Sequence, residues 1–219
     1  MTMKKTLFVF DIDGTITDSV TQHQSAFYES LEAFGIKTID SNWGAYAHHT
    51  DSYIFKSNYE DYFGKQMRDV DLFQFESLIL HHLSLKSSIN EIRGASRFLE
   101  LLSETGQAYC FATGSLKKPA INKLQQAKIS INEGLLATAN DNFSREDIVL
   151  NVIEKAKKLY QLDSFQKIVS FGDGIWDLKT AKNLNLSFVS IGNKSAHLLK
   201  EGADNHFNDF NTIQIDNFI

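Results

Sequence analysis

Short apolar runs alternate with stretches of helical periodicity over most of the chain. Five runs rich in Val, Phe and Ile have the length and composition of strands, at residues 6–12, 108–114, 135–139, 167–174 and 186–192. Between the last four runs, apolar residues recur every three or four positions, as in residues 118–129 and 144–162. Strands that are apolar on both faces and alternate with helices are typical of a parallel sheet. The pattern therefore predicts an α/β fold, with a Rossmann-like parallel sheet flanked by helices.

The alternation stops between the first two predicted strands. Helical patterns without any convincing strand fill this part of the chain, at residues 20–34, 50–64 and 70–85. Asp18 or Ser19 would cap the first of these helices. We therefore interpret residues 18–91 as an all-α insertion, and residues 1–17 and 92–219 as the α/β core domain.

Polar side chains follow three of the predicted strands at the point where each strand ends. Asp11 and Asp13 follow the first strand, residues 113–115 follow the second, and Asp173 and Asp177 follow the fourth. The carboxyl ends of parallel strands lie at one edge of a sheet, where α/β proteins bind their ligands. Four carboxylates in one crevice raise each other's pKa unless a cation lies among them, and such oxygen ligands favour Mg²⁺. A phosphate ester suits this site, because the metal neutralises phosphoryl oxygens while one aspartate attacks phosphorus.

Three motifs in this order resemble those of a known family. The stretches DIDGT (11–15), TGS (113–115) and GDGIWD (172–177) resemble the first, second and fourth motifs of the haloacid dehalogenase superfamily, in its phosphatase branch. The likeness spans residues 8–178. It implies that the all-α insertion is the family's helical cap domain, placed between the first and second motifs as in phosphoglycolate phosphatases and β-phosphoglucomutases. Such a cap would close over the site and restrict substrates to small phosphorylated metabolites.

The resemblance also implies a role for each matching residue. Asp11 would be the nucleophile and a Mg²⁺ ligand. Asp13 would bind the metal through its backbone carbonyl, and its side chain, protonated when the substrate arrives, would act as general acid and then as base. Thr113 would donate a hydrogen bond to a phosphoryl oxygen, and Asp173 and Asp177 would complete the metal shell. The remaining candidate substrate-binding residues are Gly14, His23, Gly114, Ser115 and Lys117.

The third motif of the family, usually a lysine close to a proline, has no clear counterpart after the third predicted strand. Arg145 is the best candidate for its cation, because it opens the helix at the place where that cation is expected. A guanidinium group can bind two phosphoryl oxygens at once. The alternatives are Lys117, Lys118 and the lysines within residues 154–158.

These residues predict a Mg²⁺-dependent phosphatase that hydrolyses a small phosphorylated metabolite through an aspartyl-phosphate intermediate. A phosphosugar mutase of the β-phosphoglucomutase type has the same core residues and the same cap, so it stays an alternative. A relative that binds phosphate without catalysis is the other alternative, and the unusual third motif is its only support. Asp13 argues against dehalogenation, because the family's dehalogenases lack an acid at that place.

Composition and charge narrow the setting. The formal net charge of −5 gives no sign of the basic surface that nucleic-acid-binding proteins use. No apolar stretch approaches the roughly 20 residues that a membrane span needs, and the N-terminal apolar run is too short for a secretion signal. A single cysteine, Cys110, fits a reducing compartment. We therefore expect a cytoplasmic enzyme, a monomer or weak homodimer, that binds neither nucleic acid nor membranes.

Overall fold

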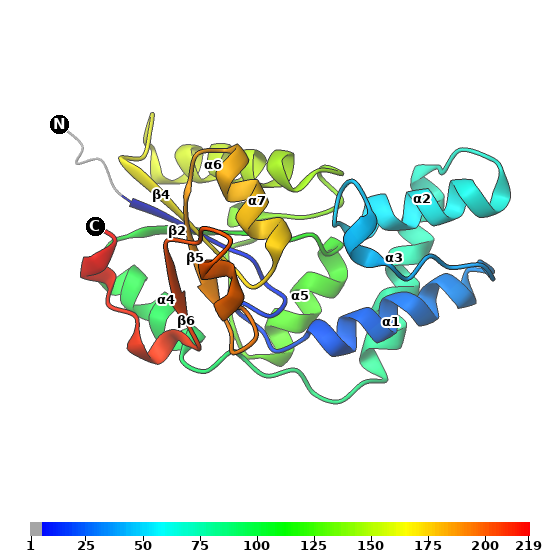
Figure 1. The fold of residues 1–219 in the computed structure, drawn as a ribbon, viewed down its shortest axis with the longest axis horizontal. Helices are drawn as coiled ribbons and strands as arrows, with labels where there is room; N and C mark the ends of the chain where they lie inside the picture. The colour runs from blue at the N-terminus through cyan, green and yellow to red at the C-terminus, as the bar shows by residue number, and fades with distance from the viewer. Residues whose placement is uncertain (1–5) are drawn as a thin grey trace.

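A six-stranded parallel sheet lies at the centre of the computed structural model, which describes residues 6–219 (Figure 1). In the order in which they pair, its strands are β3 (Leu136–Ala137), β2 (Ala108–Ala112), β1 (Thr6–Phe10), β4 (Lys167–Gly172), β5 (Ser187–Ile191) and β6 (Asn205–Phe207). Phe8 of β1 pairs in register with Tyr109 of β2 and with Val169 of β4. Every residue of β1 is buried, which explains why its sequence is apolar without alternation.

Helices cover both faces of this sheet. The four that flank it are α4 (Ala95–Glu104), α5 (Lys117–Gln126), α6 (Arg145–Tyr160) and α7 (Ile175–Asn183). On one face, Phe98 of α4 and Leu124 of α5 belong to a buried cluster with Phe8. On the other face, Ile148 of α6 belongs to a cluster with Val9. Because side chains alternate along a strand, neighbouring residues of β1 fill the two halves of the core. The predicted α/β fold is confirmed.

Three helices, α1 (Val20–Ala33), α2 (Asp51–Phe63) and α3 (Asp69–Ser84), form a helical insertion between β1 and α4, to one side of the sheet (Figure 1). They have an aromatic core of their own. The ring centroids of Phe55 and Phe75 are 3.9 Å apart, and those of Phe27 and Phe75 are 5.1 Å apart. Leu116 and Ala139, from the loops that follow β2 and β3, belong to the same cluster. The insertion therefore packs against the edge of the sheet where strands end.

The structure departs from the sequence-based prediction at several elements. The prediction lacks α4 and also β6, which has the sequence Asn-His-Phe and so no apolar run. β3 has two residues instead of the expected five. Ser19 stands at the cap position of α1 but makes no capping hydrogen bond, because its hydroxyl donates to Asp13 Oδ1 at 2.5 Å.

Two further expectations concern a membrane span and the N-terminal stretch. Within residues 6–219, no helix is long and apolar enough to cross a membrane. Residues 1–5, the first five of the predicted core domain, lie outside the described residues. They include Lys4 and Lys5 of the N-terminal stretch that we considered as a secretion signal.

Candidate active site

The loop after β1 carries Asp11 and Asp13 to the carboxyl edge of the sheet. The Asp11 backbone N–H donates to the Phe171 carbonyl at 2.9 Å, which extends the pairing of β1 with β4 beyond the strand. Gly14 then turns the chain with φ +77°, and a Cβ at this position would lie 2.1 Å from Asp173 Oδ2. The turn therefore needs glycine. Gly14 is among the residues expected to bind substrate. Its N–H donates to the Thr17 carbonyl at 2.7 Å, so this donor is already paired.

Three carboxylates meet at this edge. One oxygen from each of Asp11, Asp173 and Asp177 lies within 4.8 Å of the other two. Burial, with repulsion from Asp177, raises the pKa of Asp11 well above its ordinary value, and burial with the charges of Asp177 and Asp13 raises the pKa of Asp173 to about 8. The pKa of Asp177 is also raised, mainly by burial. Such raised values mean that negative charge is under-compensated, so this donor set fits a hard divalent cation such as Mg²⁺.

Arg145 contacts two of these three carboxylates. Its Nη2 donates to Asp11 Oδ1 at 2.9 Å and also to Asp177 Oδ1. The Ser144 hydroxyl caps α6 by accepting from the Asp147 N–H at 3.1 Å, and this places Arg145 at the first position of the helix. Burial alone would lower the pKa of Arg145, but the charges of Asp177 and Asp11 raise it above its ordinary value. The guanidinium is therefore charged at any pH at which the protein is folded.

Four of the five lysines considered as alternatives have other partners, and the fifth, Lys158, is exposed on α6. Lys117 Nζ lies 2.9 Å from Glu133, and Lys118 Nζ lies 3.5 Å from Glu76. Lys155 and Lys157 of α6 pair with Asp141 and Glu154, and these pairs are partly exposed. Lys117, expected to bind substrate, is not among the residues that line the cavity at Asp11.

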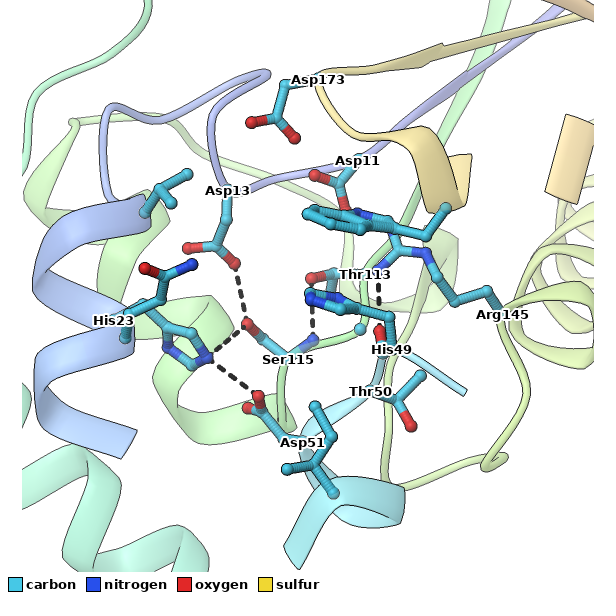
Figure 2. A pocket seen from close by; sticks show the side chains of 15 residues that line it. Asp11, Asp13, His23, His49, Thr50, Asp51, Thr113, Ser115, Arg145 and Asp173 are labelled. Carbon is cyan, nitrogen blue, oxygen red and sulfur yellow. Dashed lines mark hydrogen bonds and ion pairs between the residues drawn. The ribbon is translucent and has the colours of Figure 1, made fainter. Parts of the chain in front are cut away.

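A cavity of about 80 Å³ opens at Asp11 (Figure 2). Of the predicted site residues, those that line it are Asp11, Asp13, His23, Thr113, Gly114, Ser115, Arg145 and Asp173. Thr113 Oγ1 accepts from the Ser115 N–H at 3.1 Å, which orients the hydroxyl in the loop after β2. A Cβ on Gly114 would lie 2.5 Å from Arg145 Nη1 and 2.7 Å from the His49 carbonyl. Only glycine allows this close approach.

Lys123 is a site residue that sequence reasoning missed. Its side chain is completely buried, and its Nζ donates to Asp13 Oδ2 at 2.5 Å and Oδ1 at 2.7 Å, and to Ser115 Oγ at 2.7 Å. Burial would raise the pKa of Asp13, but the charges of Lys123 and His23, with hydrogen bonds from Lys123 and Ser19, hold that pKa well below its ordinary value. The expectation that Asp13 is protonated when the substrate arrives stays a prediction, and Lys123 is the contact that opposes it.

The helical insertion closes the other side of the cavity. His23 Nε2 of α1 lies 2.9 Å from Asp51 Oδ1 of α2, and the Leu116 N–H donates to Asp51 Oδ2 at 2.9 Å. The His49 ring stacks on Trp176 of α7, with the ring centroids 3.7 Å apart. Asp51, His49 and Trp176 were also missed. No local pattern marks them, because their contacts join segments far apart in the sequence.

Known proteins have a similar fold. The family model described as haloacid dehalogenase-like hydrolase matches residues 8–191. Among curated proteins nothing matches. A hydrolase from Pseudomonas syringae superposes with a TM-score of 0.71 at 24% identity over 94% of each chain.

Two further solved structures have lower identity. CbbY from Rhodobacter sphaeroides, in complex with phosphate, has a TM-score of 0.69 at 16% identity over 96% of each chain. A predicted phosphoglycolate phosphatase from Haemophilus somnus has a TM-score of 0.60 at 16% identity, over 95% of this chain and 96% of that one. At such identities these likenesses show the fold alone. The family model covers most of the chain, and on that ground the protein belongs to the haloacid dehalogenase-like hydrolases.

Proposed function

We propose that this protein is a Mg²⁺-dependent phosphatase that hydrolyses a small phosphorylated metabolite through an aspartyl-phosphate on Asp11. The observation that carries the proposal is the position of Asp11, which lines the cavity, belongs to the carboxylate trio and accepts a hydrogen bond from Arg145. A carboxylate placed beside a guanidinium and a hydroxyl donor suits attack on a phosphoryl group whose oxygens those donors hold.

Separate groups of residues would bind the metal and the phosphoryl oxygens. Asp11, Asp173 and Asp177, with the backbone carbonyl of Asp13, would hold Mg²⁺, which would offset the negative charge of the phosphoryl oxygens. Arg145 and the Thr113 hydroxyl would hold those oxygens while a carboxylate oxygen of Asp11 attacks phosphorus.

Proton transfer falls to the pair of Asp13 and Lys123. The pair holds the ammonium proton in a hydrogen bond, and Asp13 lines the cavity. In the first step a proton would pass from this pair to the leaving oxygen of the ester. In the second step the pair would take a proton from the water that hydrolyses the aspartyl-phosphate. We propose this shared acid in place of a neutral Asp13 carboxyl group, and the contact of Lys123 with both oxygens of Asp13 supports it.

Removal of divalent cations is expected to abolish phosphate release. Among the described residues, one guanidinium contacts this trio, in which Asp11 and Asp177 are buried and Asp173 is half-buried, so a phosphate dianion would be repelled without added positive charge. Phosphate release from p-nitrophenyl phosphate should fall to background in EDTA and return with excess Mg²⁺. Full activity after exhaustive chelation would contradict the proposed function, as would no release from a broad panel of phosphate esters.

Replacing Arg145 by alanine is expected to lower kcat/KM by about 100-fold to 1,000-fold, the usual cost of removing one donor from developing negative charge. Arg145→Lys keeps the charge but loses the second donor, so its activity should lie between those of the alanine variant and the wild type. Lys117→Ala is the matched control, because that lysine pairs with Glu133 outside the cavity. Steady-state kinetics with one ester would check the order, and an unchanged Arg145→Ala would show that another cation holds the phosphate.

A further inference from the structure

The cavity at Asp11 continues toward the helical insertion. A second cavity, of about 40 Å³, shares five lining residues with it, His23, Gln24, His49, Asp51 and Ile54. Phe27 and Trp43 complete the second cavity, which we call the alcohol subsite. An ester whose phosphorus lies at Asp11 would place its alcohol part there. What binds in the alcohol subsite therefore decides which phosphate esters the enzyme accepts.

The alcohol subsite has no cationic side chain to spare. No lysine or arginine lines it in the part of the chain that the structure describes. Two cations at the neighbouring cavity are already paired, because Arg145 contacts Asp11 and Asp177, and Lys123 contacts Asp13. The subsite does hold a carboxylate, Asp51, which is buried. A second anionic group on the substrate would meet this carboxylate and would find no free lysine or arginine as its own counter-charge.

The two histidines do not supply that counter-charge. His23 already pairs with Asp51 at 2.9 Å. Burial and the charge of Arg145 lower the pKa of His49 to about 4, so its ring is neutral at physiological pH. Figure 2 shows His23 and His49 facing each other across the cavity.

Aromatic surface makes up much of the remaining wall. The His49 ring lies parallel to Trp176, with an interplanar angle of 2°. Phe27 and Trp43 meet edge to face with ring centroids 5.6 Å apart, and Ile54 adds aliphatic surface. A wall of this kind favours apolar or ring-shaped groups over hydrated anions.

We propose that the substrate is a monophosphate ester whose alcohol part carries no second anionic group and presents an apolar or ring face to the alcohol subsite. The proposal rests on the phosphatase function proposed above. A phosphorylated carboxylic acid or a bisphosphate would lose hydration of its second anion next to Asp51, without a cation in return. Such substrates are therefore disfavoured by their charge.

Matched pairs of esters test this proposal. One pair is 2-hydroxyethyl phosphate and 2-phosphoglycolate, and the other is benzyl phosphate and 4-carboxybenzyl phosphate. With Mg²⁺ and the full-length protein, kcat/KM should be about tenfold or more higher for the uncharged member of each pair, since bringing like charges together is unfavourable.

A charge change in the alcohol subsite gives a second, independent readout. Gln24 is exposed on α1 and lines both cavities, so its substitution should leave the fold intact. Gln24→Lys should shrink the preference for the uncharged member by about threefold to tenfold, through faster hydrolysis of the charged member. Gln24→Glu is the matched control and should enlarge the same preference.

The outcomes separate the two proposals. Equal or faster hydrolysis of the charged members by the wild type would overturn the substrate class while leaving the phosphatase function standing. A preference that does not respond to Gln24→Lys and Gln24→Glu would show that the charge of the alcohol subsite does not set it. Absence of phosphate release from all four esters, and from p-nitrophenyl phosphate, would overturn the phosphatase function itself and the substrate class with it.

Discussion

Replacing Asp11 by asparagine is expected to lower kcat for phosphate release by about 10⁴-fold or more, because an amide cannot take the place of the attacking carboxylate. The substitution keeps the shape of the side chain and removes one of three clustered carboxylates that repel one another. The metal-free variant should therefore unfold at the same temperature as the wild type or at a higher one. Steady-state kinetics and thermal unfolding followed by circular dichroism would measure both effects.

Asp163→Asn is a matched control for this experiment. Asp163 is exposed in the loop between α6 and β4, at the end of β4 away from the cavity, so both its kcat and its unfolding temperature should equal those of the wild type. Turnover retained by a clean Asp11→Asn preparation would contradict the covalent mechanism. Loss of activity together with a large fall in unfolding temperature would mean that Asp11 is needed for the stability of the fold.

The strands that could be predicted from the sequence are those whose burial on both faces requires a run of apolar residues. β1, β2, β4 and β5 lie between covered faces, so each is a run of apolar residues that can be recognised without its neighbours. β6 is different because it lies at the sheet edge and pairs only with β5, and its three residues are half-buried or exposed. An edge strand is fixed by its partner's free hydrogen-bonding groups rather than by its own composition.

The site residues also differ in whether the local sequence predicts them. Asp11, Thr113 and Asp173 follow directly after strands, so their meeting could be predicted from the geometry of a parallel sheet. Lys123 lies on a helix, and its only sequence signal is a charge within the buried stripe formed with Ala120 and Leu124. His49 and Trp176 meet through contacts between the insertion and the core, which no local pattern records.

Replacing Lys123 by methionine is expected to destabilise the protein by about 3–5 kcal/mol, because removal of one partner leaves a buried charge uncompensated. Methionine keeps the length of the side chain, so the cavity left behind is small. Asp13 would lose the two hydrogen bonds that the Lys123 ammonium group donates to it, and Ser115 would lose one. Urea unfolding of the metal-free variant at pH 7 would measure the loss. A stability equal to that of the wild type would show that the ion pair contributes nothing.

The double variant Lys123→Met/Asp13→Asn separates charge from packing. If charge is the cause, the double variant should be more stable than Lys123→Met alone, because no carboxylate is left without a partner.

The stability difference between wild type and Lys123→Met should also depend on pH, in a direction that the pKa of Asp13 determines. The folded protein holds the pKa of Asp13 below its unfolded value of about 3.9, so this stabilisation is present above about pH 4 and lost as the pH falls further. The gap between wild type and Lys123→Met should therefore narrow in acid, whereas a gap due to packing would persist.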